Sequence, residues 1–373
     1  MRRSKCITLT VLAIIVLFCA TGLFAQVRQE VRIPDIMGYR TLKCDFHMHT
    51  VFSDGNVWPT VRVEEAWREG LDVIAITDHI EYQPHKQDVP TNHNRPYEIA
   101  VPLAKERGIL LIKGAEITRD TPPGHFNALF LDDINPLDTK DLLDCMAAAD
   151  KQGAFIWWNH PDWKPEHIGW FDIHTTLYEK KYMRGIEVVN GNTYSAGAHQ
   201  WALDKKLTFL GNSDIHAPSL VQQSTAEKHR PMTLVFAQEK TLAAVKDALE
   251  DGRTAIWFEK QIIGHQEHLD ALFEAIVKIT DIEREGKVAR FTLRNASDLP
   301  LELTREGRLG PKELTLPANS VLRMKLGAPN EEATLELSYV VKNFLIAPGR
   351  GLPVNMAIAG QTTIDLDVEI SAK

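Results

Sequence analysis

Short apolar segments with the pattern of β-strands alternate with helical segments from about residue 40 to residue 260. Strands that alternate with helices predict parallel βαβ units, and therefore an α/β barrel or an open parallel sheet. The expected strands are 42–49, 72–77, 109–115, 126–131, 154–158, 185–189, 208–211, 232–236 and 253–258. The expected helices are 63–69, 97–107, 142–152, 198–205 and 241–250. Most of these strands end at a polar residue, and the active sites of barrels lie at the carboxyl ends of the strands.

The pattern changes after a short connecting helix at 269–278. From residue 279, alternating apolar and polar residues, as at 288–293, are interrupted by Asn, Asp, Gly and Pro. This texture is typical of a small antiparallel β-sandwich. We therefore expect an α/β domain over 26–275 and a β-sandwich domain over 276–373.

The first 25 residues have the pattern of an export signal. Three basic residues precede an apolar segment, 6–25, and Ala25 is a small residue at which a signal peptidase can cut. A lipoprotein signal needs a small residue before its cysteine, but Phe18 precedes Cys19, which argues against lipidation. About 20 apolar residues are also enough to span a bilayer, so an uncleaved anchor is the alternative. We expect an exported, periplasmic or extracellular protein that has no membrane contact once the signal is removed.

Composition and charge exclude several classes of protein. With 44% hydrophobic and 25% charged residues, the chain is neither disordered throughout nor a polytopic membrane protein. Its formal charge is -8, and the loss of a leader with three cations and no anions makes it -11. Duplex nucleic acid is bound by clustered Lys and Arg, so we expect no such partner. Cys44 and Cys145 remain after cleavage; a disulfide is possible in an oxidising compartment, but two buried free thiols are the preferred interpretation.

The strongest local pattern is Asp-Phe-His-Met-His-Thr at 45–50. His47 and His49 are two residues apart, so on a strand their imidazoles point to the same face, where they can hold a divalent metal. Asp214 and His216 repeat this spacing at a later strand end. Other residues able to hold a metal follow or precede further strands: Asp54, His79, Glu116, His125 and His160. So many candidate ligands near strand ends of one alternating fold predict a metal centre.

These residues resemble the ligand set of the PHP (polymerase and histidinol phosphatase) family of metal-dependent phosphoesterases. The resemblance covers about residues 40–258, and all nine ligand positions of the family can be filled. It implies a distorted (β/α)7 barrel that holds up to three metals. It assigns the first metal to His47, His49, Glu116 and Asp214. It assigns the second to Glu116, His125 and His160, and the third to Asp54, His79 and His216. His160 stands where the family often has Cys.

A closer resemblance is to exported two-domain PHP proteins in which a β-sandwich follows the barrel. It is carried by His-Ile-Glu-Tyr-Gln-Pro-His-Lys at 79–86 and Gly-His-Phe-Asn-Ala at 124–128. Related members include phosphodiesterases that act on small organic phosphate diesters. The resemblance therefore implies a small phosphate-ester substrate, either a diester or a monoester.

Metal chemistry suits the hydrolysis of phosphate esters. Two metals about 3.5–4 Å apart lower the pKa of a bridging water towards 7 and hold both oxygens of an in-line displacement. We therefore expect a metal-bridging hydroxide as the nucleophile, with Glu116, Asp214 and His216 as the catalytic residues. Imidazole and carboxylate ligands without a thiolate suit Mn, Fe or Zn, and we expect two or three such divalent ions.

Other polar residues stand near the candidate ligands in the sequence. Asp45 and Asp78 are candidates to orient imidazole N–H groups, with solvation of a strand end as the alternative. Three basic residues on expected loops are candidates to bind a phosphate oxygen, although solvated loop charge is the simpler interpretation: Lys86, Arg119 and Arg230. Trp163 is a candidate wall for an apolar leaving group.

Two other functions compete with a phosphoesterase. A metal-dependent amidohydrolase or esterase would direct the same activated water at a carbonyl carbon, but such sites often include a metal-bridging Lys, and no Lys stands at an expected strand end. A non-catalytic binding protein on this scaffold would be expected to have lost ligands, and none of the nine is missing. The sequence sets neither the physiological substrate nor the oligomeric state.

Overall fold

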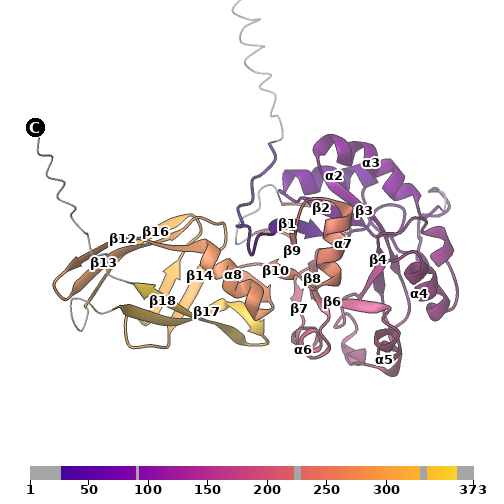
Figure 1. Cartoon of the computed structure of the whole chain (residues 1–373). Coiled ribbons are helices and arrows are strands. Elements are labelled where there is room, and N and C mark those ends of the chain that lie inside the picture. The colour runs from indigo at the N-terminus through magenta and orange to yellow at the C-terminus, as the bar shows by residue number, and fades with distance from the viewer. Residues whose placement is uncertain (1–26, 90–91, 222–227, 328–333, 359–373) are drawn as a thin grey trace, which may run out of the picture.

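The structure is a computed structural model that describes residues 27–89, 92–221, 228–327 and 334–358. An α/β part and an all-β part lie side by side, with a helix between them (Figure 1). The expected leader, 1–25, lies outside the described residues. Within the described ranges, no helix is both long and apolar enough to cross a membrane.

The strands of the α/β part form one curved, mixed sheet. In order across the sheet they are β10 (Thr254–Phe258), β9 (Met232–Ala237), β1 (Arg40–Asp45), β2 (Val73–Ile76), β3 (Leu110–Ile117), β4 (Phe126–Leu129), β5 (Phe155–Trp158), β6 (Met183–Asn190) and β8 (Thr208–Asn212). A two-residue strand, β7 (Thr193–Tyr194), turns back along the end of β6. Most residues of these strands are buried, which explains why the strands read as apolar runs in the sequence.

Not every strand of this sheet is parallel to its neighbours. β1, β2 and β3 are parallel, as are β5, β6 and β8. β4 is antiparallel to both β3 and β5, and β9 is antiparallel to both β1 and β10. The prediction of parallel βαβ units is therefore wrong for β4 and β9, while the distorted α/β barrel followed by a β-sandwich is confirmed.

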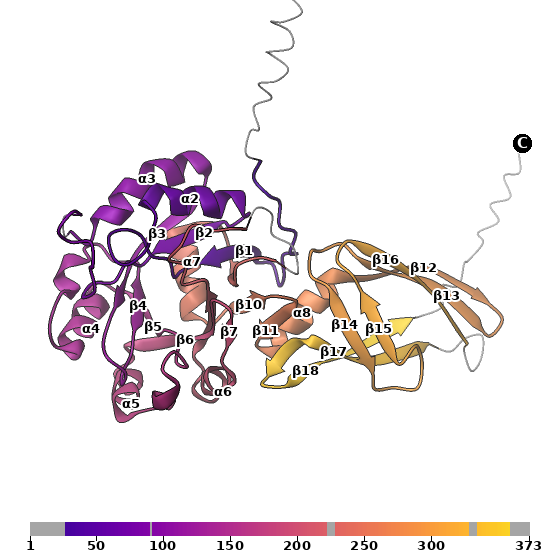
Figure 2. The same ribbon diagram turned by 180° about the vertical axis from the view of Figure 1, so that it is seen from behind.

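Helices cover the outside of the curved sheet, as the two opposite views show (Figures 1 and 2). They are α2 (Pro59–Arg68), α3 (Arg95–Arg107), α4 (Leu142–Lys151), α5 (Asp172–Glu179), α6 (Ala196–Lys205) and α7 (Leu242–Glu250). Side-chain caps explain several of their starts, since Asp141, Ser195 and Thr241 each accept a hydrogen bond from the third residue of the following helix. α5 was not expected from the sequence.

Side-chain hydrogen bonds bring β8 against β9 and β10. The Thr233 hydroxyl donates to the carbonyl of Gly211 at 2.9 Å and accepts from its N–H at 3.0 Å, and the Thr254 hydroxyl donates to the carbonyl of Phe209 at 2.8 Å. The approach is so close that a Cβ atom on Gly211 would lie 2.2 Å from Cγ2 of Ile256. A glycine is therefore required where β8 meets β10.

The all-β part is a sandwich of two antiparallel sheets. One contains β14 (Leu301–Arg305), β15 (Glu313–Leu316), β17 (Leu335–Ala347) and β18 (Arg350–Ile358), and the other contains β12 (Val277–Glu285), β13 (Val288–Asn295) and β16 (Ser320–Gly327). In β18 every second residue is buried, which is the period expected of a sheet with one face on a core.

Two elements join the barrel to the sandwich. β11 (Gln261–Gly264) pairs with β10 on one side and in parallel with β17 on the other, so one sheet runs through both parts. α8 (Gln266–Ile276) lies between the two parts (Figure 2) and buries Leu269, Leu272, Phe273 and Ile276 in a core shared with both. The spacing of these four residues places them on one face of the helix.

The structure also settles the state of the cysteines. Cys44 and Cys145 are both buried and unpaired, as the sequence interpretation preferred. The burial of Cys145 raises the pKa of its thiol to about 12, so this sulfur stays protonated at neutral pH.

Candidate metal centre

All nine candidate ligands gather at one edge of the barrel. His47 and His49 follow β1, which ends at Asp45 and is shorter than the strand expected from the sequence. His79 lies after β2, Glu116 near the end of β3, and His160 after β5. Asp214 and His216 lie after β8, Asp54 lies in the loop between β1 and α2, and His125 lies just before β4.

The reversed direction of β4 explains how His125 reaches the centre. The other strands that carry ligands present their carboxyl ends at this edge. β4 runs antiparallel to its neighbours β3 and β5, so its amino end lies at the same edge, and His125 is the residue immediately before it. A parallel β4 would have placed His125 at the opposite end of the barrel.

The donor atoms fall into four overlapping groups, in each of which all atoms lie within 4.8 Å of one another. The groups are His49, Asp54, His79 and His216; His47, His49 and Glu116; His47, His160 and Asp214; and His79, Glu116 and His125. They differ in detail from the division that the family resemblance implies, because His47, His49 and His79 each take part in two of them. Their roles as ligands stay a prediction.

Several of these donor atoms are buried without a hydrogen-bond partner among the described residues: His47 Nε2, His49 Nε2, Glu116 Oε2 and Asp214 Oδ1. They face one another, with His47 Nε2 3.4 Å from the Glu116 oxygen and His49 Nε2 3.0 Å from the Asp214 oxygen. Buried polar atoms are nearly always satisfied in folded proteins, so a group of unsatisfied ones marks a place for a ligand. Two imidazole nitrogens and two carboxylate oxygens fit a divalent metal.

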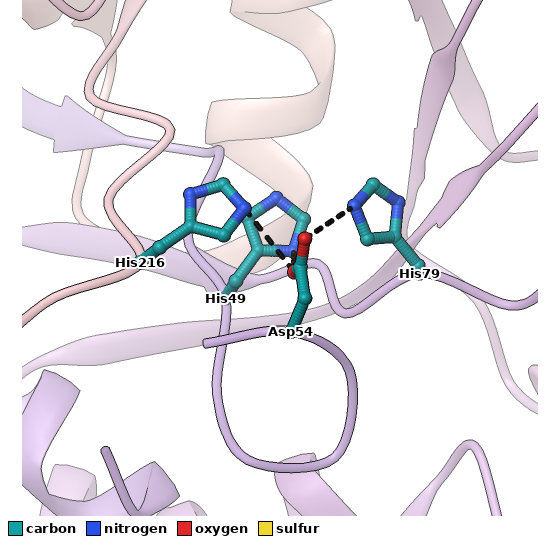
Figure 3. Close-up of side chains that lie close together, drawn as sticks. All are labelled: His49, Asp54, His79 and His216. Atoms are coloured by element: carbon teal, nitrogen blue, oxygen red, sulfur yellow. Dashed lines mark ion pairs between the residues drawn. The ribbon is translucent and has the colours of Figure 1, made fainter. Parts of the chain in front are cut away.

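A second part of the centre surrounds Asp54 (Figure 3). Its carboxylate lies between His216 and His79, with Oδ1 3.1 Å from His216 Nε2 and Oδ2 3.5 Å from His79 Nε2. The imidazole of His49 stacks on that of His216 with centroids 4.2 Å apart, so this part is continuous with the donor atoms around Glu116. Asp54 is the only carboxylate in the group of four that includes it.

Opposite charges stabilise one another in this cluster. Burial alone would lower the pKa of His47, but Asp214, Glu187 and Glu116 raise it well above its usual range. Burial is likewise outweighed at His79, whose pKa rises to about 10 beside Glu116. Burial would raise the pKa of Glu116, but His79 and His47 hold it well below its usual range. The carboxylates therefore attract positive charge to this edge, whether it arrives as protons or as metal ions.

Glu187, in the middle of β6, supports the centre and was not predicted. Its Oε1 accepts hydrogen bonds of 2.9 Å from His47 Nδ1 and from the Asn212 amide. Its Oε2 accepts from the Asn190 amide at 2.9 Å and from the backbone N–H of His160 at 3.0 Å. Because Nδ1 of His47 donates to Glu187, Nε2 is the nitrogen that faces the cluster, and in the neutral ring it would carry the lone pair. The sequence feature that could have identified Glu187 is the presence of an acidic residue inside the apolar run 185–189.

Asp45 and Asp78 hold loops rather than imidazoles. Asp45 accepts hydrogen bonds from the backbone and the hydroxyl of Ser213, at 3.1 and 2.5 Å. Asp78 accepts from the backbone and the hydroxyl of Thr50, both at 2.6 Å, and from the Ser53 hydroxyl at 2.7 Å. Asp78 reaches His49 only through Ser53, whose hydroxyl is 3.3 Å from Nδ1. The prediction that these carboxylates orient imidazoles directly is wrong.

The basic residues expected to bind phosphate lie in different surroundings. Arg230 is buried, and its guanidinium donates to Glu69 at 2.8 and 2.9 Å and to Asp45 at 2.9 Å, so it braces the barrel and is closed to a substrate. Arg119 pairs with Glu81 and donates to the carbonyl of Thr139, which fixes a loop. Lys86 is exposed. The interpretation of Arg230 as a substrate-binding residue is therefore wrong.

Comparison with solved structures agrees with this architecture. A two-domain protein from Bacteroides vulgatus, described as containing a predicted PHP-like metal-dependent phosphoesterase, is 45% identical in sequence and superimposes with a TM-score of 0.85. The match covers 90% of this chain and 100% of that one. This chain belongs to the PHP family. A family model described as an Ig-like domain matches residues 277–357, which are the β-sandwich that follows the PHP barrel.

Two further matches are more distant. A 5'-3' exoribonuclease of Haemophilus influenzae is 34% identical over 118 residues, which make up 31% of this chain and only 39% of that protein. An amidohydrolase from Chromobacterium violaceum, with bound sulfate and no metal, is 17% identical over 47% of this chain and 88% of its own, with a TM-score of 0.39. At that distance the second likeness carries no argument about activity.

Proposed function

We propose that this protein is an exported phosphoesterase that hydrolyses small phosphate esters, diesters or monoesters, with divalent metal ions. Membership of the PHP family supports a metal-dependent hydrolase. The observation that carries the proposal is the group of buried donor atoms of His47, His49, Glu116 and Asp214, which face one another without hydrogen-bond partners among the described residues.

The residues that would hold the ions are the nine gathered at the barrel edge, in two or three sites. When bound, such ions would lower the pKa of a coordinated water towards 7, so that a hydroxide nucleophile is available, and would draw in the phosphate oxygens. Mn, Fe and Zn all suit a set of imidazoles and carboxylates.

The chain's own contribution is to fix the tautomers of the imidazoles. His47 donates from Nδ1 to Glu187, and His216 donates from Nδ1 to the carbonyl of Asp214 at 2.7 Å, so both rings present Nε2 lone pairs to the centre. Asn190 donates to the second oxygen of Asp214 at 3.3 Å, which leaves Oδ1 free to face His47 and His49. Ligands held in this way lose little freedom when an ion binds.

Charge supports an anionic substrate. Asp54, Glu116 and Asp214 contribute three negative charges to the centre, so three divalent ions would leave it at about +3 before hydroxide binds. The expected mature chain carries about -11 in total, so the centre would be a strongly positive place on an acidic molecule. A phosphate ester would be attracted there. With the ions in place, we assign Glu116, Asp214 and His216 to the catalytic machinery, as residues that position the reacting groups.

The test joins metal analysis to hydrolysis. The purified protein, assayed for metal content, should hold two or three divalent ions and hydrolyse p-nitrophenyl phosphate or bis(p-nitrophenyl) phosphate; the better substrate separates a monoesterase from a diesterase. His47→Ala should lose both metal and activity, whereas His85→Ala, on an exposed loop, should keep both. Activity indifferent to His47 would refute the proposal. Preferential hydrolysis of p-nitrophenyl acetate would favour an esterase or amidohydrolase.

A further inference from the structure

A pocket of about 210 Å³ opens beside the candidate metal centre, between the loop after β5 and the end of β6. We call it the β5–β6 pocket; the residues that matter here are His160, Asp162, Trp163, Asn190 and Thr193. Pockets that bind drug-sized ligands measure ~300–1,000 Å³, so this one suits a smaller organic group.

The pocket and the metal centre share a wall. His160 Nε2 lies 3.3 Å from Glu116 Oε1 and 4.0 Å from Asp214 Oδ2. Asn190 donates its amide N–H to Asp214 at 3.3 Å and to Glu187 at 2.9 Å. A phosphate bound at the centre would therefore lie next to the β5–β6 pocket, which is within reach of one of its ester substituents.

One wall of the pocket is aromatic. Trp163 is 55% exposed, which is unusual for so large an apolar side chain. Its indole packs beside the imidazoles of His125 and His160, with centroids 5.0 and 5.7 Å apart, and the ammonium of Lys164 lies 5.0 Å from its ring centroid. An exposed ring held in this way offers a flat apolar surface to the body of a ligand.

Two other side chains around the pocket, Asp162 and Asn190, offer hydrogen-bond acceptors. Asp162 Oδ1 is buried and has no partner among the described residues. The amide N–H groups of Asn190 are directed at Glu187 and Asp214, which leaves its carbonyl oxygen to face elsewhere, and the side chain of Thr193 is exposed. A ligand that brings a hydrogen-bond donor would satisfy this carboxylate, whereas a ligand without donors would leave it unsatisfied. A second anionic group would be repelled by Asp162.

We infer that the β5–β6 pocket receives a neutral, hydroxylated group, a sugar or polyol, that is esterified to the phosphate. The inference rests on the proposed function, and it makes Asp162 and Trp163 specificity-determining residues. The hydroxyls donate to Asp162 and Asn190, while the C–H face of the ring packs on Trp163.

The test compares three non-hydrolysable probes that share a six-membered ring, a methylene and a phosphonate: glucosylmethylphosphonate, cyclohexylmethylphosphonate and benzylphosphonate. Their dissociation constants for the metal-loaded protein are measured by calorimetry, with methylphosphonate as the reference for the phosphonate group alone. We expect the glucosyl probe to bind at least tenfold more tightly than the cyclohexyl and benzyl probes.

Two variants locate the preference. In Asp162→Ala the affinities for the glucosyl probe and for the cyclohexyl and benzyl probes should differ by no more than about twofold, while the affinity for methylphosphonate stays unchanged. Thr193→Val, at an exposed position, should reduce the preference for the glucosyl probe by a smaller factor. Equal or tighter binding of the cyclohexyl or benzyl probe, no binding of the glucosyl probe, or a preference that survives in Asp162→Ala would each overturn the inference. Because the probes are not hydrolysed, the result is separate from the hydrolysis test: activity on p-nitrophenyl esters without a probe preference overturns the pocket alone, and a probe preference without activity overturns the phosphoesterase alone.

Discussion

The carboxylate of Glu187 accepts four hydrogen bonds, two at each oxygen, from His47, Asn212, Asn190 and the backbone of His160. A side-chain amide cannot replace it, because the NH₂ group of Gln would face donors. Glu187→Gln should therefore loosen the imidazole of His47 and lower metal affinity about 10–100-fold. Competition with a chromophoric chelator measures this loss. The matched control is Glu274→Gln, an exposed position on α8 that should bind metal as the wild type does. Equal affinities in the two variants would contradict the role given to Glu187.

The surroundings of His174 lead us to expect a pH dependence of folding stability that does not involve the metal centre. Its ring is buried and stacks on Trp158 with centroids 3.8 Å apart. Nδ1 accepts from the backbone N–H of Phe171 and Nε2 donates to the carbonyl of Pro123, so only the neutral ring satisfies both contacts. Burial, against a smaller opposing effect of the Pro123 carbonyl, lowers its pKa to about 4. The contribution of the neutral His174 ring to the stability of the folded protein is thus complete above the ordinary histidine pKa of about 6.5. It is lost as the pH falls towards 4.

The contribution of His174 is measured as a difference between variants. Urea unfolding of the wild type and of His174→Phe should show a free-energy difference that shrinks by about 1.4 kcal/mol per pH unit between pH 6 and 4.5. The exposed variant His85→Phe should follow the pH dependence of the wild type. A difference between wild type and His174→Phe that stays constant over this range would show that the ring does not titrate as proposed.

At the scale of elements, the close approach of β8 to β10 makes a sharp prediction. A Cβ on Gly211 would overlap Ile256 at 2.2 Å, and both lie on strands that cannot separate without breaking the hydrogen bonds of Thr233 and Thr254. Gly211→Ala should lower the free energy of unfolding by about 1–3 kcal/mol. In Gly197→Ala the added methyl, on α6, meets nothing closer than 3.9 Å, so the same chemical change should be neutral or slightly stabilising. Chemical denaturation of both variants checks the contrast.

The direction of the strands is one part of the fold that the apolar pattern did not provide. Periodicity placed β1 to β6 and β8 to β10 within a few residues. It did not give their direction, because buried parallel and antiparallel strands look alike in sequence. The length of the connection did contain the answer for β4. Only residues 118–125 separate it from β3, and a parallel crossover needs a dozen residues or more.

The same limit applies to the centre itself. The nine candidate ligands were recognisable because His, Asp and Glu stand out at strand ends, whereas Glu187 is inside a strand and Arg230 precedes one. A basic residue near a ligand motif reads alike in sequence whether it faces solvent or two buried carboxylates. Only the packing of β1, α2 and the segment before β9 shows that Arg230 is enclosed by Glu69 and Asp45.

At the scale of the whole molecule, one of the apolar clusters is shared by the barrel and the sandwich. A single cluster contains Phe236 and Trp257 of the barrel, Phe273 of α8, and Leu337 and Phe344 of the sandwich. Neither part can unfold alone without exposing apolar surface of the other. Calorimetry should therefore show one cooperative transition, and Phe273→Ala should lower it as a whole by about 3–5 kcal/mol. Two separate transitions, with only one moved by Phe273→Ala, would contradict a shared core.

The proposed export can be tested by counting thiols, because the expected leader contains two of the four cysteines. Cys6 and Cys19 belong to the first 25 residues, while Cys44 and Cys145 are buried in the barrel. A protein cleaved after Ala25 should begin at Gln26 in N-terminal sequencing and react with two equivalents of a thiol reagent in denaturant, and with almost none when folded, since both remaining thiols are inaccessible. A retained anchor would give four thiols in denaturant and a protein that sediments with membranes. The count of thiols thus separates release into the exported compartment from anchorage to the membrane.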